Sequence, residues 1–105
     1  ADLSLDNNTH NPKISKRVMI KNGQIPHLTN FSQGYFPHGE IVEEHSHKDM
    51  YEVFFVEEGT ATFKINGKDY RLESGSCLTV ELGDRHEIRN ESGRELVITY
   101  FGVEV

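Results

Sequence analysis

Apolar and polar residues alternate in short runs along most of the chain, starting near residue 16. The runs are rich in β-branched and aromatic residues, and Gly, Asn, Asp and Ser separate them at intervals of about ten residues, as in β-sandwiches and β-barrels. No stretch has the apolar period of an amphipathic helix. The pattern predicts one all-β domain over residues 16–105. Residues 1–15 are polar and show no period, so we expect them to form a flexible N-terminal arm.

A hairpin is predicted where Asn66 and Gly67 separate two alternating runs. An Asn-Gly pair tolerates the positive φ angles of a type I′ turn, so the flanking runs should pair with Phe63 opposite Tyr70. A second turn is predicted at residues 91–94, just before the closing strand.

The run over residues 51–58 is largely apolar on both faces. Because alternate side chains of a strand share a face, Glu52 lies with Phe54 and Val56, and we assign that face to the interior. The opposite face carries Tyr51, Val53 and Phe55. This second face has to be covered by another sheet or by another subunit.

Four polar side chains are predicted to point into the interior. His45 and His47 are two residues apart, so both imidazoles lie on the same side of an extended strand. Glu52 belongs to the interior face of the next run. His86 alternates with charged neighbours that face water, so it also points inward.

Buried without partners, these four groups would each cost about 1 to 3 kcal/mol, against a total stability of about 5 to 15 kcal/mol. One divalent transition-metal ion would satisfy them all, and a mixed set of nitrogen and oxygen ligands suits Fe, Mn, Co, Ni, Cu or Zn. An ion that takes about six ligands would keep about two positions open for a small molecule. A single inward histidine is more often a core residue than a ligand, but four such groups together favour a metal site.

The spacing of these residues resembles the two sequence motifs of the cupin superfamily. The first motif fits Gly39-x5-His45-x-His47-x4-Glu52-x6-Gly59, and the second fits Gly75-x5-Glu81-x-Gly83-x2-His86-x3-Asn90. Glu81 departs from the pattern, because the family usually has Pro there, and we expect this to loosen the turn before Gly83. The resemblance covers residues 39–90. It implies a small single-domain cupin with a double-stranded β-helix (jelly-roll) barrel and with His45, His47, Glu52 and His86 as metal ligands.

The resemblance also implies metal chemistry, since cupins with this ligand set include dioxygenases, sugar isomerases or epimerases, decarboxylases and lyases. Our first hypothesis is a metalloenzyme that acts on an oxygen-rich small molecule by dioxygenase or sugar-type isomerase chemistry. Glu52 would serve as a ligand or, if it detaches, as a catalytic base. The alternative is a non-catalytic module that binds a metal or a small ligand, and in a third hypothesis the ion only stabilises the barrel. Fold alone does not decide among them.

Composition narrows the partners and the location. The 105 residues carry a formal net charge of −6 without a cluster of Lys or Arg, so no nucleic acid and no membrane surface is expected as a partner. No apolar run reaches the about 18 residues of a membrane span, and no signal-peptide pattern is present. Cys77 is the single cysteine, which fits a cytoplasmic location. We interpret it as a small buried residue on a strand.

A homodimer is expected from the apolar surface. Hydrophobic residues make up 35% of the chain, which predicts a small core that a partner subunit could complete. The outer face of the 51–58 run and the run Val18-Met19-Ile20 would supply the interface. Similar small cupins commonly dimerise through an N-terminal strand and an exposed sheet.

The remaining histidines are assigned away from the metal. His10 lies in the arm, and His27 and His38 lie in loop-like settings as surface residues or as neighbours of the ligands. Three further residues are candidates for lining the pocket, although the sequence leaves their strand phase open: Gln33, Tyr35 and Tyr100.

Overall fold

The computed structural model describes residues 5–7 and 13–105. Within these ranges the regular structure consists of strands, which confirms the all-β prediction. The strands are β1 Leu5–Asn7, β2 Ser15–Ile20, β3 Leu28–Phe36, β4 Ile41–His45, β5 Met50–Glu58, β6 Thr60–Ile65, β7 Lys68–Glu73, β8 Cys77–Val80, β9 His86–Arg89 and β10 Leu96–Glu104. Among the described residues no helix has the length and apolar character to cross a membrane.

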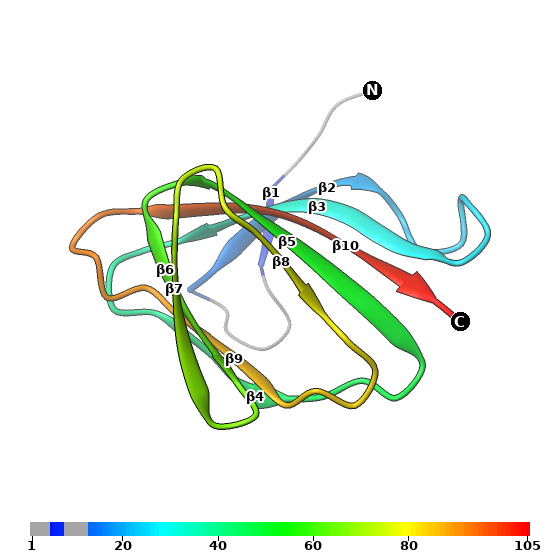
Figure 1. The fold of residues 1–105 in the computed structure, drawn as a ribbon. Coiled ribbons are helices and arrows are strands. Elements are labelled where there is room, and N and C mark those ends of the chain that lie inside the picture. The colour runs from blue at the N-terminus through cyan, green and yellow to red at the C-terminus, as the bar shows by residue number, and fades with distance from the viewer. Residues whose placement is uncertain (1–4, 8–12) are drawn as a thin grey trace.

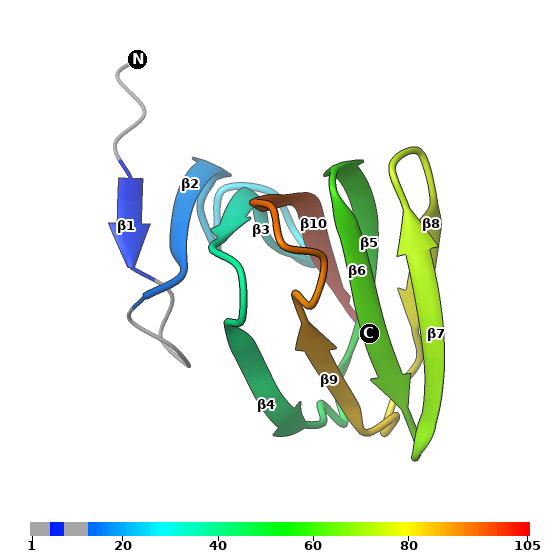
Figure 2. The same cartoon turned by 90° about the vertical axis from the view of Figure 1, so that its left-hand side faces the viewer.

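The strands form two antiparallel sheets that face each other (Figure 1). The larger sheet has the order β1-β2-β3-β10-β5-β8, and the smaller has the order β4-β9-β6-β7. Figure 2 shows the smaller sheet, with β4 beside β9 and β6 beside β7. Segments far apart in sequence are therefore neighbours in space, so that side chains from both halves of the chain can meet between the sheets.

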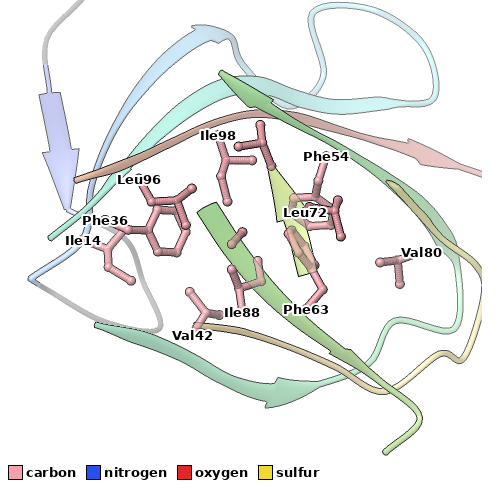
Figure 3. Packing of buried hydrophobic residues seen from close by; sticks show 12 residues of the cluster. Ile14, Phe36, Val42, Phe54, Phe63, Leu72, Val80, Ile88, Leu96 and Ile98 are labelled. Atoms are coloured by element: carbon pink, nitrogen blue, oxygen red, sulfur yellow. The ribbon is translucent and has the colours of Figure 1, made fainter. Parts of the chain in front are cut away.

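The core fills the space between the two sheets (Figure 3). Its buried residues are Ile14, Phe36, Val42, Phe54, Val56, Ala61, Phe63, Leu72, Val80, Ile88, Leu96 and Ile98. The rings of Phe54 and Phe63 come from opposite sheets and lie with their centroids 5.2 Å apart. Each such large apolar side chain contributes about 1.5 to 3 kcal/mol on burial, so the packed sheets form a rigid frame for the polar groups at one end.

The predicted hairpin is confirmed in position and register. Phe63 of β6 lies opposite Tyr70 of β7. Asn66 and Gly67 connect the strands with φ angles of 49° and 85°, the left-handed values that a type I′ turn requires. The turn predicted at residues 91–94 also lies where expected, between β9 and β10.

The two faces of β5 have the predicted orientations. Phe54 and Val56 are buried, whereas Tyr51 and Phe55 are 36% and 37% exposed on the outer face. The interpretation of Cys77 as a buried residue is wrong, because Cys77 is exposed. It lies opposite Phe55 in the β5–β8 register, and residues opposite each other share a face, so Cys77 points outward with Phe55.

The N-terminal arm expected over residues 1–15 falls mostly on residues 1–4 and 8–12, which lie outside the described residues, as does His10. Its described part includes β1, which pairs with β2, and Ile14, which is fully buried in the core. The flexibility of the remainder stays a prediction.

Asn90, directly after β9, is a fully buried polar residue. Its Nδ2 donates to the carbonyl oxygens of Phe36 at 2.9 Å and Arg94 at 2.6 Å. Its Oδ1 accepts hydrogen bonds from the backbone N–H of Ser92 at 3.1 Å and from the Ser92 hydroxyl at 2.7 Å. Asn90 thus ties the end of β3 to the turn that starts β10, which keeps the two sheets joined at this end.

Candidate metal centre

The four predicted residues come from three strands and one connection. His45 is the last residue of β4 and lies opposite His86, the first residue of β9. Glu52 lies in β5 of the other sheet. His47 lies in the connection after β4, rather than on an extended strand as the sequence predicts, and its carbonyl accepts a 2.7 Å hydrogen bond from Gly83. The two motif segments are thereby joined directly beside the cluster.

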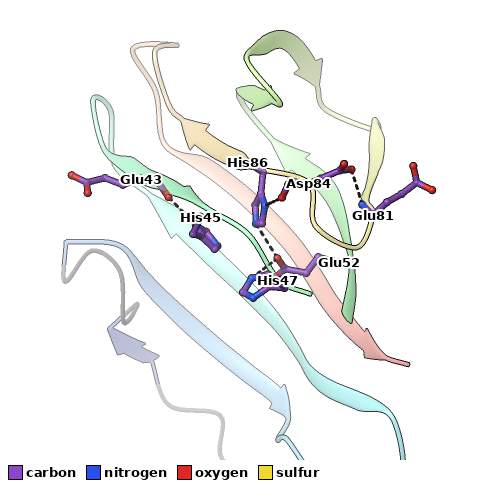
Figure 4. Close-up of polar contacts among 7 residues, drawn as sticks. All are labelled: Glu43, His45, His47, Glu52, Glu81, Asp84 and His86. Atoms are coloured by element: carbon purple, nitrogen blue, oxygen red, sulfur yellow. Dashed lines mark hydrogen bonds and ion pairs between the residues drawn. The ribbon is translucent and has the colours of Figure 1, made fainter. Parts of the chain in front are cut away.

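The side chains of these residues converge on one point (Figure 4). One potential ligand atom from each of His45, His47, Glu52 and His86 lies within 4.8 Å of the others. Glu52 Oε1 is 3.1 Å from His47 Nε2 and 3.0 Å from His86 Nε2. Bonds of about 2.0 to 2.2 Å place ligand atoms on one ion about 3 Å apart at right angles and about 4.2 Å apart across it. Small side-chain movements would therefore bring all four to one ion.

Two of the imidazoles are held in the tautomer that places the metal-binding lone pair on Nε2. His45 Nδ1 lies 2.8 Å from the Glu43 carbonyl oxygen, and His86 Nδ1 lies 3.1 Å from the Asp84 carbonyl oxygen. A carbonyl only accepts hydrogen bonds, so each Nδ1 carries a proton, and in the neutral ring Nε2 is the nitrogen with the lone pair that a metal binds. Hydrogen bonding of this kind commonly orients metal-binding histidines.

Two buried atoms in the cluster lack hydrogen-bond partners among the described residues. Glu52 Oε1 and His86 Nε2 are close, yet their geometry does not meet that of a hydrogen bond, and neither atom is exposed to water. An unsatisfied buried polar atom costs about 1 to 3 kcal/mol. Since a divalent ion would satisfy both atoms, the donor set fits a metal.

The turn that carries His86 is fixed by an Asp84 side chain. Asp84 Oδ2 accepts a 2.9 Å hydrogen bond from the backbone N–H of Glu81, and Oδ1 accepts a 3.0 Å bond from Asn66. The Asn66 bond and the Glu81 N–H lower the pKa of the Asp84 carboxyl. A Pro at position 81 has no N–H to donate, so the expected loosening is countered by a bond that only a non-Pro residue makes. The Glu81 side chain points away from the cluster (Figure 4).

The surroundings of His86 and Tyr100 shift the pKa values of both residues. Burial acts to lower the pKa of His86, but the carboxylate of Glu52 and the carbonyl and charge of Asp84 outweigh it and raise that pKa above 6.5. Burial and the charge of Glu52 raise the pKa of Tyr100 to about 12, against an opposing contact with Ser32. Tyr100 therefore keeps its proton at neutral pH and serves as a hydrogen-bond donor.

His86 should make the stability of the metal-free chain depend on pH. Because its pKa is raised in the folded state, protonated His86 stabilises the fold below the unfolded-state pKa, and this contribution is lost as the pH rises through the folded-state pKa. A metal requires the neutral ring, so the increase in melting temperature caused by Ni(II) should instead grow with pH. Melting curves at about pH 6 and about pH 8, with EDTA or with Ni(II), measure both effects. His86→Gln should reduce the pH dependence seen with EDTA; an equal dependence in this variant would contradict the assignment.

A cavity of about 190 Å³ opens beside the cluster. Its lining residues are Lys16, Asn30, Phe36, Val42, His45, His47, Met50, Glu52, Phe54, Ile88, Ile98 and Tyr100. His47 and Glu52 are 27% and 13% exposed, whereas His86 is fully buried behind them. A small molecule in the cavity would thus meet the cluster from the side of His47 and Glu52.

The pocket candidates have different outcomes. Tyr100 lines the cavity. Asn30 and Phe36 are the residues of β3 that line the cavity, and Gln33 and Tyr35 lie on the opposite face of this strand. There the Tyr35 hydroxyl donates a 2.6 Å hydrogen bond to Gln33. His27 and His38 are exposed in connections between strands. Sequence reasoning missed Lys16, Asn30 and Met50, because nothing local in the sequence shows which strands border the cavity.

Comparison with known proteins identifies a family and several relatives. Residues 34–102 match the sequence profile of the Cupin domain family. The oxalate-binding protein of Thermotoga maritima is 29% identical over 83 residues, which are 79% of this chain and 64% of that protein. The chain therefore spans less than two thirds of the length of this relative.

Solved structures share the fold at low sequence identity. A predicted oxalate decarboxylase from Thermotoga maritima has a TM-score of 0.91 and 17% identity, over 99% of this chain and 95% of that one. A sugar phosphate isomerase from Silicibacter pomeroyi has a TM-score of 0.83 and 12% identity, over 99% of this chain and 73% of that one. The predicted jelly-roll barrel is thus confirmed, and at these identities the likeness extends to the fold alone.

Proposed function

The chain belongs to the Cupin domain family, and from this premise we propose that it is a metal-dependent enzyme that acts on a small, oxygen-rich molecule. The observation that carries the proposal is the convergence of four ligand-type side chains, two of them with orphaned buried atoms, at the wall of a cavity. A bound ion would satisfy both atoms at once.

In the proposed site His45, His47, Glu52 and His86 hold one divalent ion, of Fe, Mn, Ni, Zn, Co or Cu. When bound, the ion supplies Lewis acidity and, if it is a redox metal, dioxygen chemistry. His86 is the rigid ligand, since it is buried and tied to Asp84. Apolar residues such as Phe54 and Ile98 keep much of the cavity wall free of water.

Two reaction classes fit these residues, dioxygenase and sugar-type isomerase or epimerase. In the second class Glu52 would release its place in the cluster and accept a proton from a substrate carbon, with Tyr100 donating a hydrogen bond to a substrate oxygen. Glu52 is suited to this role because it is partly exposed and lines the cavity. A sugar phosphate isomerase among the structural neighbours supports the isomerase class, and a predicted oxalate decarboxylase supports metal chemistry on a small acid.

The second candidate function is a non-catalytic module that binds a metal or small ligand. The relative described as an oxalate-binding protein favours it. So does the small cavity, which is below the about 300 to 1,000 Å³ of pockets for drug-sized ligands.

Elemental analysis of the chain purified without added metal tests the shared part of both proposals, and we expect about one transition-metal ion per chain. Oxygen uptake with catechols and keto acids, and isomerisation of keto sugars followed by NMR, then separate enzyme from binder. Glu52→Gln tests whether turnover depends on the Glu52 carboxylate. Asp49→Asn is its control, because it removes one acidic charge outside the cluster. Turnover that depends on Glu52 supports the enzyme; metal and ligand binding with no turnover for any of these classes supports the binder.

We also propose a homodimer in the cytoplasm. The exposed Tyr51, Phe55 and Val103 form an apolar outer face on β5 and β10, and Val103 lies opposite Tyr51 in the register. The single cysteine suits a reducing compartment. A mass of two chains by light scattering, reduced to one chain by Tyr51→Lys, supports the dimer, and a wild-type mass of one chain rejects it.

A further inference from the structure

We infer that the cavity selects a small dianion, in which one acidic group binds at the four-residue cluster and the second is held by Lys16, Asn30 and Tyr100. The inference rests on the proposed function, because it assumes a metal ion in the cluster. It adds a substrate class that separates small dicarboxylates and phosphorylated acids from neutral sugars, polyols and catechols.

Among the described residues that line the cavity, the lysine is Lys16. It lies opposite Gly34 in the β2–β3 register, so the two positions share a face of the sheet. A Cβ added at Gly34 would lie 3.1 Å from Phe36 Cε1 and 3.4 Å from Tyr100 Cε1, and both rings line the same cavity. Lys16 therefore belongs to the cavity face of β2 rather than to the outer surface.

The two polar neighbours on this wall are hydrogen-bond donors. Asn30 Oδ1 accepts a 3.0 Å bond from the Ser32 hydroxyl, which leaves the Asn30 amide hydrogens for the cavity. The Tyr100 hydroxyl also lines the cavity and carries a proton at neutral pH, as an ordinary phenol does. A wall of one ammonium group, one amide and one phenol favours an acidic oxygen group over a neutral sugar, because hydrogen bonds between charged partners are the stronger ones.

The summed charge of the cavity also favours a ligand with two negative charges. The charges of Lys16 and Glu52 cancel, and the three histidines are neutral as ligands, so a divalent ion would leave the cavity with a net charge of about +2. A ligand with two negative charges neutralises this site, whereas a monoanion leaves one charge uncompensated. The positive site is local, because the whole chain has a net charge of −6.

Cavity size limits the ligand. The volume of about 190 Å³ suits a compact molecule with its two acidic groups separated by one or two atoms. Malonate has this form with two negative charges at neutral pH. Phosphoglycolate has it with between two and three, because its phosphate alone carries about −1.5 to −2. Glycolate is a smaller acid with a single negative charge, and glycerol has none.

The test is calorimetric titration of the Ni(II)-loaded chain with malonate, phosphoglycolate, glycolate and glycerol. We expect a dianion to bind about 10- to 100-fold more tightly than glycolate, the ratio that a charge-assisted contact supplies. Lys16→Met should remove this ratio, and Lys16→Arg should largely retain it. Lys21→Met is the matched control, because Lys21 is an exposed lysine outside the cavity. The affinities of malonate and phosphoglycolate, compared with the extra charge of the phosphate taken into account, identify the second acidic group.

Nickel content, measured before and after each titration, separates a failure of the proposed metal site from a failure of the dianion inference. A chain that retains no Ni(II) rejects the proposed function itself. A loaded chain that binds glycolate as tightly as the dianions, or a Lys16→Met variant that keeps the wild-type ratio, overturns only the inference.

Discussion

His86→Ala is expected to reduce sharply the metal-dependent rise in melting temperature that the wild-type chain should show with Fe(II), Mn(II), Ni(II) or Zn(II). A ligand that binds the native state raises its stability, so the rise reports the affinity directly. Protein sites with four ligands bind Zn(II) with about 10 to 16 kcal/mol, so one ligand accounts for about 3 kcal/mol, or an affinity on the order of 100-fold. His86 should show this loss in full, since it is buried and its ring orientation is fixed by Asp84.

The control is His27→Asn. His27 is an exposed histidine with a φ of 70°, a value that Asn tolerates, and it lies outside the cluster. Glu52→Gln provides a second test in case His86→Ala folds poorly, because it keeps the shape of the side chain and removes its charge. A metal-dependent rise of wild-type size in both cluster variants would show that the ion binds elsewhere or that the cluster is a purely structural feature.

Asn90→Ala is expected to lower the free energy of unfolding by about 3 kcal/mol, which for a domain of this size is a fall in melting temperature of about 12 to 24 °C. The substitution leaves the carbonyl oxygens of Phe36 and Arg94 without their Asn90 donor. It also removes the acceptor for both donors of Ser92. Thermal and urea denaturation measure the loss.

Ser92→Ala is the matched control for this prediction. Ser92 is partly exposed and its hydroxyl makes part of the same network, but the Asn90 donors stay in place. We expect a cost of about 1 kcal/mol for it. If Asn90→Ala costs no more than Ser92→Ala, Asn90 does not tie β3 to the β10 turn in the way described.

The sequence predicted the features that depend on strand parity and on local turns. The inward orientation of His86 follows from its alternation with charged neighbours, and the hairpin register follows from Asn66 and Gly67. Both are properties of a few consecutive residues, so they can be recognised without knowing the rest of the fold. The convergence of the four cluster residues was predicted by the same parity, with support from the cupin motifs.

Other features depend on which strands become neighbours, and sequence reasoning missed them. Cys77 points outward because β8 pairs with β5 in one particular register, and its apolar character alone suggested burial. Lys16 faces the cavity because β2 extends the sheet beside β3. The contact between Gly83 and His47 joins two segments that are distant in sequence. The alternation along a strand shows which side chains share a face, but it does not show which other strands or cavities that face contacts.

The tip of the β6–β7 hairpin has a second role beyond reversing the chain. Asn66 Nδ2 donates to Asp84, and Asn66 Oδ1 accepts a 2.9 Å bond from the backbone N–H of Arg85, the residue before His86. Hairpin tips are usually the preferred places for inserting tags, epitopes or whole domains. In this protein such an insertion would disturb the support of the cluster. An engineer should choose the exposed connection over residues 21–27, which contributes no residue to the cavity lining.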